Sequence, residues 1–407
     1  MFRENDKSIN GHHIYLYDDG VPILLPCLFA RFIQVANQSV VRKTIKNEDT
    51  ERKETRFEQK EICDDTAKTY GNHVGRFLEW VDNYKTIEQV SLNNHTALPS
   101  EVINEYINDY LIDECQSSES VARGAVNSLQ AYYNFLFHHF KNKDKQIGIK
   151  SEYLPIARSN SKGALHVKYL LPKTCEIFYR KAPSLLHEIV LRNGGELGCR
   201  AKENQGFLLN DFTAHKEKHH GLLTLFKQLE ANPEQEEFKY HLKSIYAKYG
   251  SSRTLYISKL LLKKMKQYYD KERPESDSNH LLVSNAKNRR GKPIGKGFAS
   301  TVFLNIKKEL MQDAQDNPLL YSNIQDIEKG WSYHILRHSF GTDFFYNLCE
   351  GQNKRYESIT TTSAVYIETA RRMGHKVDAK GAGDVTKRYI HSCGHRETLL
   401  KETVNEM

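Results

Sequence analysis

One stretch of the sequence gathers side chains that could bind a phosphate and move a proton, and it reads His334-Ile-Leu-Arg337-His338-Ser339-Phe340. His334 and Arg337 are three residues apart, so on a helix their side chains share a face. A guanidinium offers a rigid fork of donors that matches phosphate oxygens, and an imidazole can donate or accept a proton near neutral pH. A lone His-x-x-Arg would indicate a solvated helix end, but the full string predicts a phosphate pocket.

Three shorter motifs accompany this stretch. Arg200 and Glu203 form an Arg-x-x-Glu pair upstream, Gly374-His375 follows downstream, and Tyr389 lies in a Thr-x-x-Tyr-x-His context. Cleavage of a phosphodiester without a metal needs a nucleophile, cations at the phosphate and an acid for the leaving oxygen. The sequence shows neither an acidic cluster with two-metal nuclease spacing nor a Walker-type glycine-rich loop, so Arg, His, Lys and Tyr are the groups available.

In order and local context, the four motifs between residues 200 and 391 resemble the signature of the tyrosine recombinase (phage integrase) family. The resemblance implies that Tyr389 is the nucleophile and forms a covalent 3′-phosphotyrosyl bond with DNA. Because this bond retains the energy of the phosphodiester, rejoining would need no ATP, metal or other cofactor. A free phenol has a pKa near ~10, so its attack requires neighbouring cations and a base. Any other of the 23 tyrosines is read as a packing residue.

The resemblance also assigns roles to the other motif residues. Arg200 and Arg337 would clamp the non-bridging oxygens of the scissile phosphate and stabilise the pentavalent transition state. His334 and His375 would donate hydrogen bonds and help to move the tyrosine proton. The supporting residues would be Glu203 and His338.

A lysine completes the catalytic set in the family, where it lies on a β-hairpin and protonates the 5′ oxygen. The segment Lys248-Tyr-Gly-Ser-Ser-Arg253 precedes an expected strand and makes Lys248 the candidate. A solvated hairpin lysine is the alternative reading of Lys248, and Lys243 is the second candidate for the acid. The spacing between Arg200 and Lys248 departs from the family, because residues 213–237 form an insertion there.

Composition favours an intracellular protein with a polyanionic partner. Lys and Arg number 59 against 51 acidic residues, which gives a net charge of +8,. The seven cysteines contain no Cys-x-x-Cys pair, so they fit a reducing cytoplasm and predict no disulfide framework,. His215, His219 and His220 lie in a charged segment and are read as solvated, so no metal site is predicted. No apolar run is long enough to span a bilayer. We expect a cytoplasmic, nucleoid-associated bacterial protein without a membrane partner.

The chain divides into four parts by pattern and composition. We expect residues 1–61 to form a hairpin, a helix and a charged linker, 62–140 a helical core-type DNA-binding domain, 141–168 a basic interdomain linker, and 169–407 an α+β catalytic domain with a C-terminal tail. The expected fold class is mainly α with a small antiparallel β-sheet. The resemblance implies that the helical and catalytic domains form a C-shaped clamp on DNA.

Local patterns predict individual elements. Residues 18–20 read as a hairpin turn, a helix is expected over 28–36, and residues 42–61 read as an exposed linker or irregular helix. In the last domain we expect strands over 238–247 and 254–257, and helices from 172 and over 258–269, 297–314, 334–347 and 361–373.

The basic stretch between the two main domains suits a strap across DNA phosphates, with an ordinary solvated linker as the alternative. The residues expected to contact DNA are Lys141, Lys143, Lys145, Lys150, Arg158, Lys162 and Arg253.

Taken together, these patterns predict a site-specific DNA recombinase or integrase of a mobile element, acting through a Holliday junction in integration, excision or transposition. Its expected partners are double-stranded DNA at specific recombination sites and further copies of the chain in a tetramer, with a partner recombinase or an accessory DNA-bending protein as additional candidates. Two alternatives stay open: a type IB topoisomerase-like strand transferase, and a non-catalytic DNA-binding partner or regulator. No motif reveals the target sequence, because base readout depends on which side chains reach the groove edges.

Overall fold

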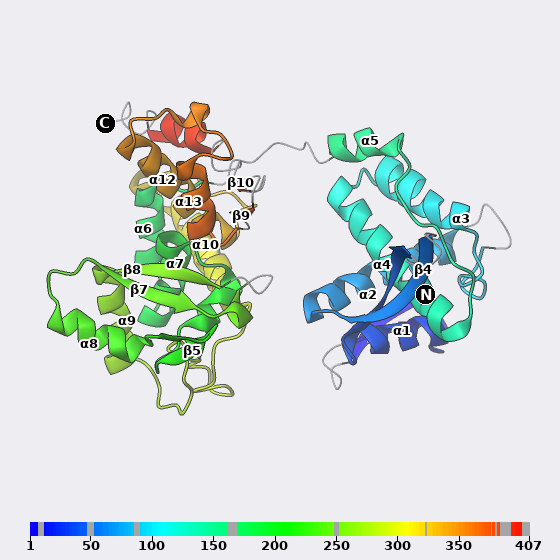
Figure 1. Cartoon of the computed structure of the whole chain (residues 1–407), viewed down its shortest axis with the longest axis horizontal. Helices are drawn as coiled ribbons and strands as arrows, with labels where there is room; N and C mark the ends of the chain where they lie inside the picture. The colour runs from blue at the N-terminus through cyan, green and yellow to red at the C-terminus, as the bar shows by residue number, and fades with distance from the viewer. Residues whose placement is uncertain are drawn as a thin grey trace. The chain divides into compact units, whose positions relative to one another are not determined.

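The computed structural model forms two compact units, residues 1–165 and 166–407, each with its own hydrophobic core (Figure 1). The residues that it describes are 1–6, 12–46, 53–84, 90–160, 169–247, 252–321, 324–375, 377–378, 381–382 and 392–400. Helices dominate, and every sheet in these ranges is a two-stranded antiparallel pair. The predicted fold class, mainly α with small antiparallel β-structure, is confirmed.

The first unit consists of a helical bundle and two hairpins. Its helices are α1 (Leu24–Gln34), α2 (Asp64–Asn83), α3 (Ser100–Glu105), the π-helix η1 (Tyr106–Glu114), α4 (Glu119–Phe140) and α5 (Tyr153–Asn160). Its hairpins pair β1 (Phe2–Asp6) with β2 (His12–Leu16) and β3 (Gln38–Lys46) with β4 (Lys53–Glu61).

Helices α2 and α4 supply most of the first core. The hydroxyl of Ser118 accepts a hydrogen bond from the backbone N–H of Val121 at 3.4 Å and begins α4,. Buried residues then recur at three- and four-residue spacing along α4, which turns one wide apolar face toward α2,. The chain leaves the helix at Lys141, whose φ of 55° is the left-handed value that ends many helices,.

The N-terminal elements differ from the sequence prediction. The turn at residues 18–20 is present, but the strand before it pairs with β1, and only a single bridge joins Leu16 to Pro22. Helix α1 begins at Leu24, earlier than predicted, since Pro26 lies in its first turn, where its missing N–H costs no hydrogen bond,.

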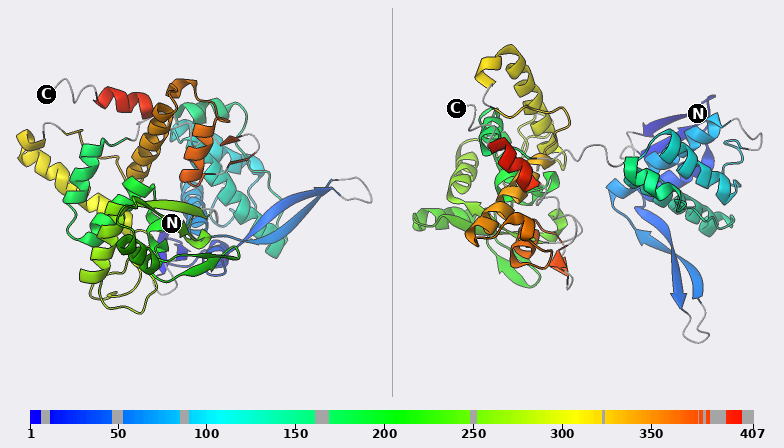
Figure 2. Two further views of the ribbon diagram at one scale, coloured as in Figure 1. Left: turned by 60° about the vertical axis from the view of Figure 1, so that its left-hand side comes forward. Right: turned by 90° about the horizontal axis from the view of Figure 1, so that it is seen from above.

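The charged segment predicted as an exposed linker or irregular helix over residues 42–61 is a β-ribbon formed by β3 and β4 (Figure 2). Its cross-strand contacts are largely polar, as in the ion pair between Lys43 and Glu58, so the segment has no apolar alternation to reveal it,. At its base Val40 is buried, and the ring of Phe57 stacks on Phe137 with centroids 4.4 Å apart. The base of the ribbon is therefore part of the core of the first unit.

The basic segment after α4 was predicted as a flexible linker, and its described part is attached to the first unit. The backbone N–H of Gly148 donates to Asn104 Oδ1 at 3.0 Å, and that of Lys150 donates to Asn108 Oδ1 at 2.9 Å. Helix α5 then follows, with Ala157 buried against the bundle. Residues 161–168 of the predicted linker lie outside the described residues.

The second unit combines helices with short two-stranded sheets. Its helices are α6 (Pro172–Arg180), α7 (Leu185–Leu197), η2 (Ala201–Gly206), α8 (Leu222–Ala231), η3 (Ser244–Tyr246), α9 (Lys259–Lys271), α10 (Phe298–Asp316), α11 (Pro318–Tyr321), α12 (His334–Gly351), η5 (Tyr356–Ser358), α13 (Ala364–Arg372) and a last helix over 392–400. Its strand pairs are β5 (Phe212–Ala214) with β6 (Glu217–His219), β7 (Glu237–Leu242) with β8 (Arg253–Ser258), and β9 (Val377–Asp378) with β10 (Gly381–Ala382).

The predicted strands and helices of this unit are present with shifted ends. The 213–237 insertion consists of the β5–β6 hairpin and α8. Among the described residues, no helix is long and apolar enough to cross a membrane.

Close packing of α7 against α12 positions the chain that enters the candidate site. A Cβ on Gly194 of α7 would lie 2.9 Å from the ring and hydroxyl of Tyr333 and 3.1 Å from the Cβ of Leu336 of α12, so a larger residue would force these side chains to shift,. Helix α7 ends at Gly198 with φ +61°, and a Cβ there would meet the ring of Phe340 at 2.6 Å. The left-handed turn at Gly198 directs the next residues, including Arg200, back across the end of α12,.

Candidate active site

Four segments far apart in the sequence meet in the second unit. Arg200 and Glu203 follow α7, Arg253 begins β8, Arg337 lies in the first turn of α12, and His375 follows α13. The structure thus brings together four of the predicted motif residues, and it adds Arg253 to them.

Glu203 is the centre of this cluster, with only 1% of its side chain exposed. Its Oε1 accepts from Arg200 Nη1 at 2.7 Å, and its Oε2 accepts from Arg253 Nη2 at 2.8 Å and lies 3.8 Å from Arg337 Nη1. The same carboxylate accepts from the backbone N–H of Arg200 at 2.9 Å. Burial alone would raise the pKa of Glu203, but the charges of the three arginines outweigh it and lower that pKa to about 2,. Glu203 is therefore a permanent anion that orients guanidinium groups.

Arg337 is almost fully buried, with 1% of its side chain exposed. Its Nη1 donates to the carbonyl of Gly198 and its Nη2 donates to the carbonyl of Met373. A buried guanidinium is tolerated when its donors are paired in this way. These bonds connect the ends of α7 and α13 to the first turn of α12. Arg337 therefore holds the cluster together and also contributes a positive charge to it.

The Nε2 atom of His375 lies 3.4 Å from Nη2 of Arg337. A guanidinium can only donate, so Nε2 is the acceptor, and the neutral ring then carries its proton on Nδ1. Burial, followed by the charges of Arg337, Arg200, Arg253 and His334, lowers the pKa of His375 to about 3. The imidazole is therefore neutral near pH 7 and offers one N–H donor. Gly374 before it has φ +62°, which turns the chain sharply after α13.

The two histidines of the α12 motif have different environments. His334 is exposed on the first turn, one turn from Arg337, whereas His338 is 8% exposed, and their rings meet edge to face with centroids 4.7 Å apart. Ser339 of the same motif has a structural role: its hydroxyl accepts from the backbone N–H of Leu170 at 2.8 Å and donates to the carbonyl of Ile335 at 3.0 Å. His334 is thus the motif histidine that solvent and ligands reach.

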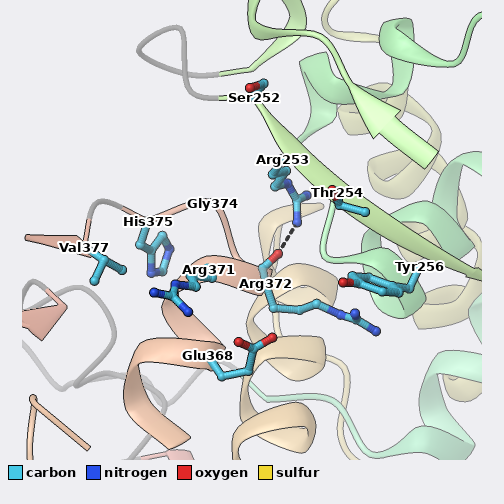
Figure 3. A pocket seen from close by; sticks show the side chains of 10 residues that line it. All are labelled: Ser252, Arg253, Thr254, Tyr256, Glu368, Arg371, Arg372, Gly374, His375 and Val377. Atoms are coloured by element: carbon cyan, nitrogen blue, oxygen red, sulfur yellow. Dashed lines mark hydrogen bonds between the residues drawn. The ribbon is translucent and has the colours of Figure 1, made fainter. Parts of the chain in front are cut away.

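A cavity of about 400 Å³ adjoins His375 (Figure 3). Sequence reasoning missed two arginines that line it, Arg371 and Arg372 in the last turn of α13, although they directly precede the Met-Gly-His motif. The guanidinium of Arg372 lies 3.7 Å from the centre of the Tyr256 ring,. The carbonyl of Arg372 accepts from Arg253, and the dashed line in Figure 3 marks this bond between α13 and β8. The cavity is lined chiefly by cationic and polar side chains, with Glu368 as an acid.

Two residues predicted to contact DNA, Arg253 and Lys145, are buried in the structure. Only 4% of the Arg253 side chain is exposed, because its guanidinium binds Glu203 and the carbonyls of Gly198 and Arg372. Lys145 is 5% exposed within the first unit. In a sequence, a charged residue reads as a surface residue, and only the fold reveals partners drawn from distant segments.

The other predicted positions divide into exposed cations and residues without a description. Arg158 is exposed and pairs with Glu119 at 3.1 Å. The remaining exposed lysines of the stretch are Lys141, Lys143 and Lys150. Three predicted site residues lie outside the described residues, namely Tyr389, Lys248 and Lys162.

The histidines of the insertion form no metal-binding group of three or more ligands within the described ranges. The ring of His219 stacks on His241 with centroids 3.8 Å apart, and His220 Nδ1 lies 3.6 Å from an oxygen of Asp211.

Comparison with known proteins gives matches among solved structures alone. No protein-family model matches the chain, and no curated protein matches it. XerA recombinase is 16% identical, with a TM-score of 0.34 over 81% of this chain and 92% of that one. The Tn1549 transposon integrase in complex with transposon right end DNA is 11% identical, with a TM-score of 0.46 over 92% and 98% of the two chains. A lambda integrase tetramer bound to a Holliday junction is 12% identical, with a TM-score of 0.38 over 91% and 97%.

Each of these three proteins is a recombinase or an integrase.

Proposed function

We propose that the chain is a tyrosine recombinase, a site-specific DNA strand transferase that cleaves and rejoins DNA through a 3′-phosphotyrosyl intermediate. The observation that carries the proposal is the convergence of Arg200, Arg337 and His375 around the buried carboxylate of Glu203. These residues belong to three motifs of the family signature that are far apart in the sequence, and the fold brings them together.

The charge of the cluster suits a phosphodiester. Three guanidiniums, from Arg200, Arg253 and Arg337, surround one carboxylate, so the cluster keeps an excess of positive charge. Arg200 is 23% exposed and is the guanidinium of this set that a ligand reaches most readily. Negative charge builds up on the non-bridging oxygens in the pentavalent transition state, so fixed cations there lower the barrier more than they strengthen ground-state binding.

Residues of this chain can supply the nucleophile, the proton acceptor and the proton donor that the proposed reaction needs. The phenol oxygen of Tyr389 attacks the phosphorus, the bond from phosphorus to the 5′ oxygen breaks, and the phenol proton is released. Neutral His375 donates its N–H to a phosphate oxygen, and exposed His334 helps to move the phenol proton. Lys248 protonates the leaving 5′ oxygen. Attack of a 5′ hydroxyl on the phosphotyrosine reverses every step and rejoins the strand.

Recombination would require four protomers on two DNA sites and successive strand exchanges through a Holliday junction. Contacts between DNA phosphates and the exposed side chains of Lys141, Lys143 and Lys150 fit this assembly,. As the recombinase of a mobile element, the protein would carry out integration, excision or transposition. A type IB topoisomerase-like enzyme would share the chemistry and lack the exchange, and a non-catalytic DNA-binding partner would lack both.

The test is a covalent-complex assay with wild type and Tyr389→Phe. Both proteins are incubated in EDTA with nicked DNA from the ends of the element that carries the gene, and the products are run on denaturing gels. We expect an adduct with wild type alone, while both proteins bind DNA equally in a mobility-shift assay. Tyr269→Phe, on α9 away from the cluster, is the matched control and should form the adduct.

The same assay separates the alternatives. Supercoil relaxation without exchange between two sites would identify a topoisomerase-like enzyme. DNA binding without any wild-type adduct would identify a non-catalytic partner and overturn the proposal.

A further inference from the structure

The first unit contains a cavity of about 640 Å³ lined by aromatic rings that the proposed reaction does not use. Helix α2 contributes Trp80 and Tyr84, and the π-helix η1 contributes Tyr106 and Tyr110. The ring centroid of Trp80 lies 4.5 Å from that of Tyr84, 5.3 Å from that of Tyr106 and 6.2 Å from that of Tyr110. Trp80, Tyr84 and Tyr110 are only partly buried, so this aromatic wall faces an accessible space.

The electrostatic character of the cavity favours a cation. Glu79 and Glu114 line it, and the single cation among its described lining residues, Arg76, has an exposed side chain. Helix α2 ends at Asn83 and η1 ends at Glu114, and both of these residues line the cavity. Helix C-termini carry partial negative charge, and the faces of aromatic rings attract cations. Two carboxylates, two helix ends and four rings thus act in the same direction.

Tyr106 adds a hydrogen-bonding group to the cavity. The residue is fully buried, and its hydroxyl has no hydrogen-bond partner in the described part of the chain. Tyr106 is one of the residues that line the cavity. Buried polar groups are almost always paired, and a phenol can donate or accept, so the unpaired hydroxyl of this lining residue is a group with which a ligand could form a hydrogen bond.

The backbone that carries these residues is itself unusual. Residues 106–114 form a π-helix, a rare conformation that is frequently found at functional sites,. The wider turn places Tyr106 and Tyr110 almost one turn apart with their rings stacked at 5.8 Å, and the N–H of Cys115 donates to the carbonyl of Tyr110 at 2.8 Å. The π-helix thereby aligns two aromatic faces along one wall of the cavity.

We propose that this cavity binds a guanidinium or alkylammonium group, supplied by a free amine or by an arginine or lysine side chain of a protein segment. The cation lies against the rings of Trp80 and Tyr110, Glu79 and Glu114 balance its charge, and one of its N–H groups donates to Tyr106 Oη. The site is independent of strand exchange, so it can be tested without a DNA substrate.

The full-length chain reports binding directly, because Trp80 and Trp331 are its two tryptophans. Trp331→Phe leaves Trp80 as the only tryptophan, which can be excited selectively over the tyrosines. We would titrate this variant, at constant ionic strength, with agmatine and with an arginine-containing peptide flanked by alanines. A saturable change in Trp80 fluorescence is expected. Tighter binding of the peptide would identify a protein side chain as the source, and equal or tighter binding of agmatine would identify a free amine.

Substitutions in the same background test the chemistry. Glu79→Gln combined with Glu114→Gln should raise the dissociation constant roughly tenfold. Glu101→Gln, an exposed acid of α3 outside the cavity, is the matched control and should leave binding unchanged. Tyr106→Phe should weaken agmatine binding about fivefold without lowering the melting temperature, because its hydroxyl forms no bond in the fold.

Two results would overturn the proposal. The first is the absence of a saturable signal with both probes. The second is a signal that the double glutamate substitution does not weaken.

Discussion

Two charge clusters next to α7 have opposite compositions. In the first, Arg192 is surrounded by three carboxylates, with nitrogen–oxygen distances of 3.0 Å to Glu176, 2.8 Å to Glu188 and 2.7 Å to Glu196. Its guanidinium also lies 4.5 Å from the centre of the Tyr179 ring. In the second, Glu203 is surrounded by three guanidiniums.

The two clusters differ in whether their charges are balanced within the fold. The N–H groups of Arg192 donate to carboxylates, which balance the charge of this buried guanidinium. The first cluster therefore has no excess positive charge with which to bind an anionic ligand. The Glu203 cluster carries more positive than negative charge, adjoins a cavity and contains a partly exposed arginine. A phosphate would supply the missing negative charge. The sign of the uncompensated charge, more than the number of ion pairs, marks the candidate site.

The largest difference between the clusters should appear when each loses a carboxylate. Glu203→Gln would leave three guanidiniums around a neutral amide, and we expect it to lower the free energy of unfolding by about 3–5 kcal/mol. Glu188→Gln leaves Arg192 with two carboxylates and should cost about 1 kcal/mol. Urea denaturation of the two variants measures both values, and equal losses would contradict the special position of Glu203.

Conservative replacement of the arginines should separate activity from stability. Arg200→Lys removes a forked donor at the phosphate, so we expect single-turnover cleavage to slow about 100-fold with little change in melting temperature. Arg192→Lys removes the two parallel bonds to Glu176 and should lower stability while the folded protein cleaves at nearly the wild-type rate. The account fails if Arg192→Lys slows cleavage as much as Arg200→Lys.

The neutral imidazole of the second cluster predicts a pH dependence. The pKa of His375 is about 3 in the folded chain, below its ordinary value of 6.5. Because the unfolded chain binds the proton more readily, the stability that this group contributes is fully present above pH 6.5 and falls as the pH decreases toward 3,. The loss at about pH 5 should be about 2 kcal/mol.

His375→Gln removes that titration, so the difference in unfolding free energy between neutral pH and about pH 5 should shrink by a similar amount. An unchanged pH dependence in the variant would show that His375 is not held neutral by burial and its cationic neighbours.

The smallest effects are expected in the basic stretch of the first unit. Lys141→Ala and Lys150→Ala each remove an exposed cation, and each should weaken DNA binding modestly and reduce the salt-dependence slope by about one,. Lys145→Ala should leave that slope unchanged, because Lys145 is buried. Binding isotherms at several salt concentrations distinguish the three variants, and a lower slope for Lys145→Ala would contradict its burial.

Sequence patterns predicted what depends on local chemistry. The helix over 334–347 and the strands around 238 and 254 carry clear periodicity, and the motif residues Arg200, Glu203, Arg337 and His375 do meet in one cluster. The β3–β4 ribbon was not predictable, since its polar side chains give no alternation. The π-helix η1 was not predictable either, because its apolar residues repeat at spacings that also fit an α-helix. The role of Arg253 depends on Glu203, fifty residues away.

The most direct test of the central claim is to identify the residue that DNA modifies. Wild-type protein would be trapped on nicked DNA, digested with nuclease and protease, and examined by peptide mass spectrometry. We predict a nucleotide remnant on Tyr389, linked through the phenol oxygen. A remnant on any other residue, or an unmodified Tyr389 peptide from protein that carries the adduct, would contradict the account.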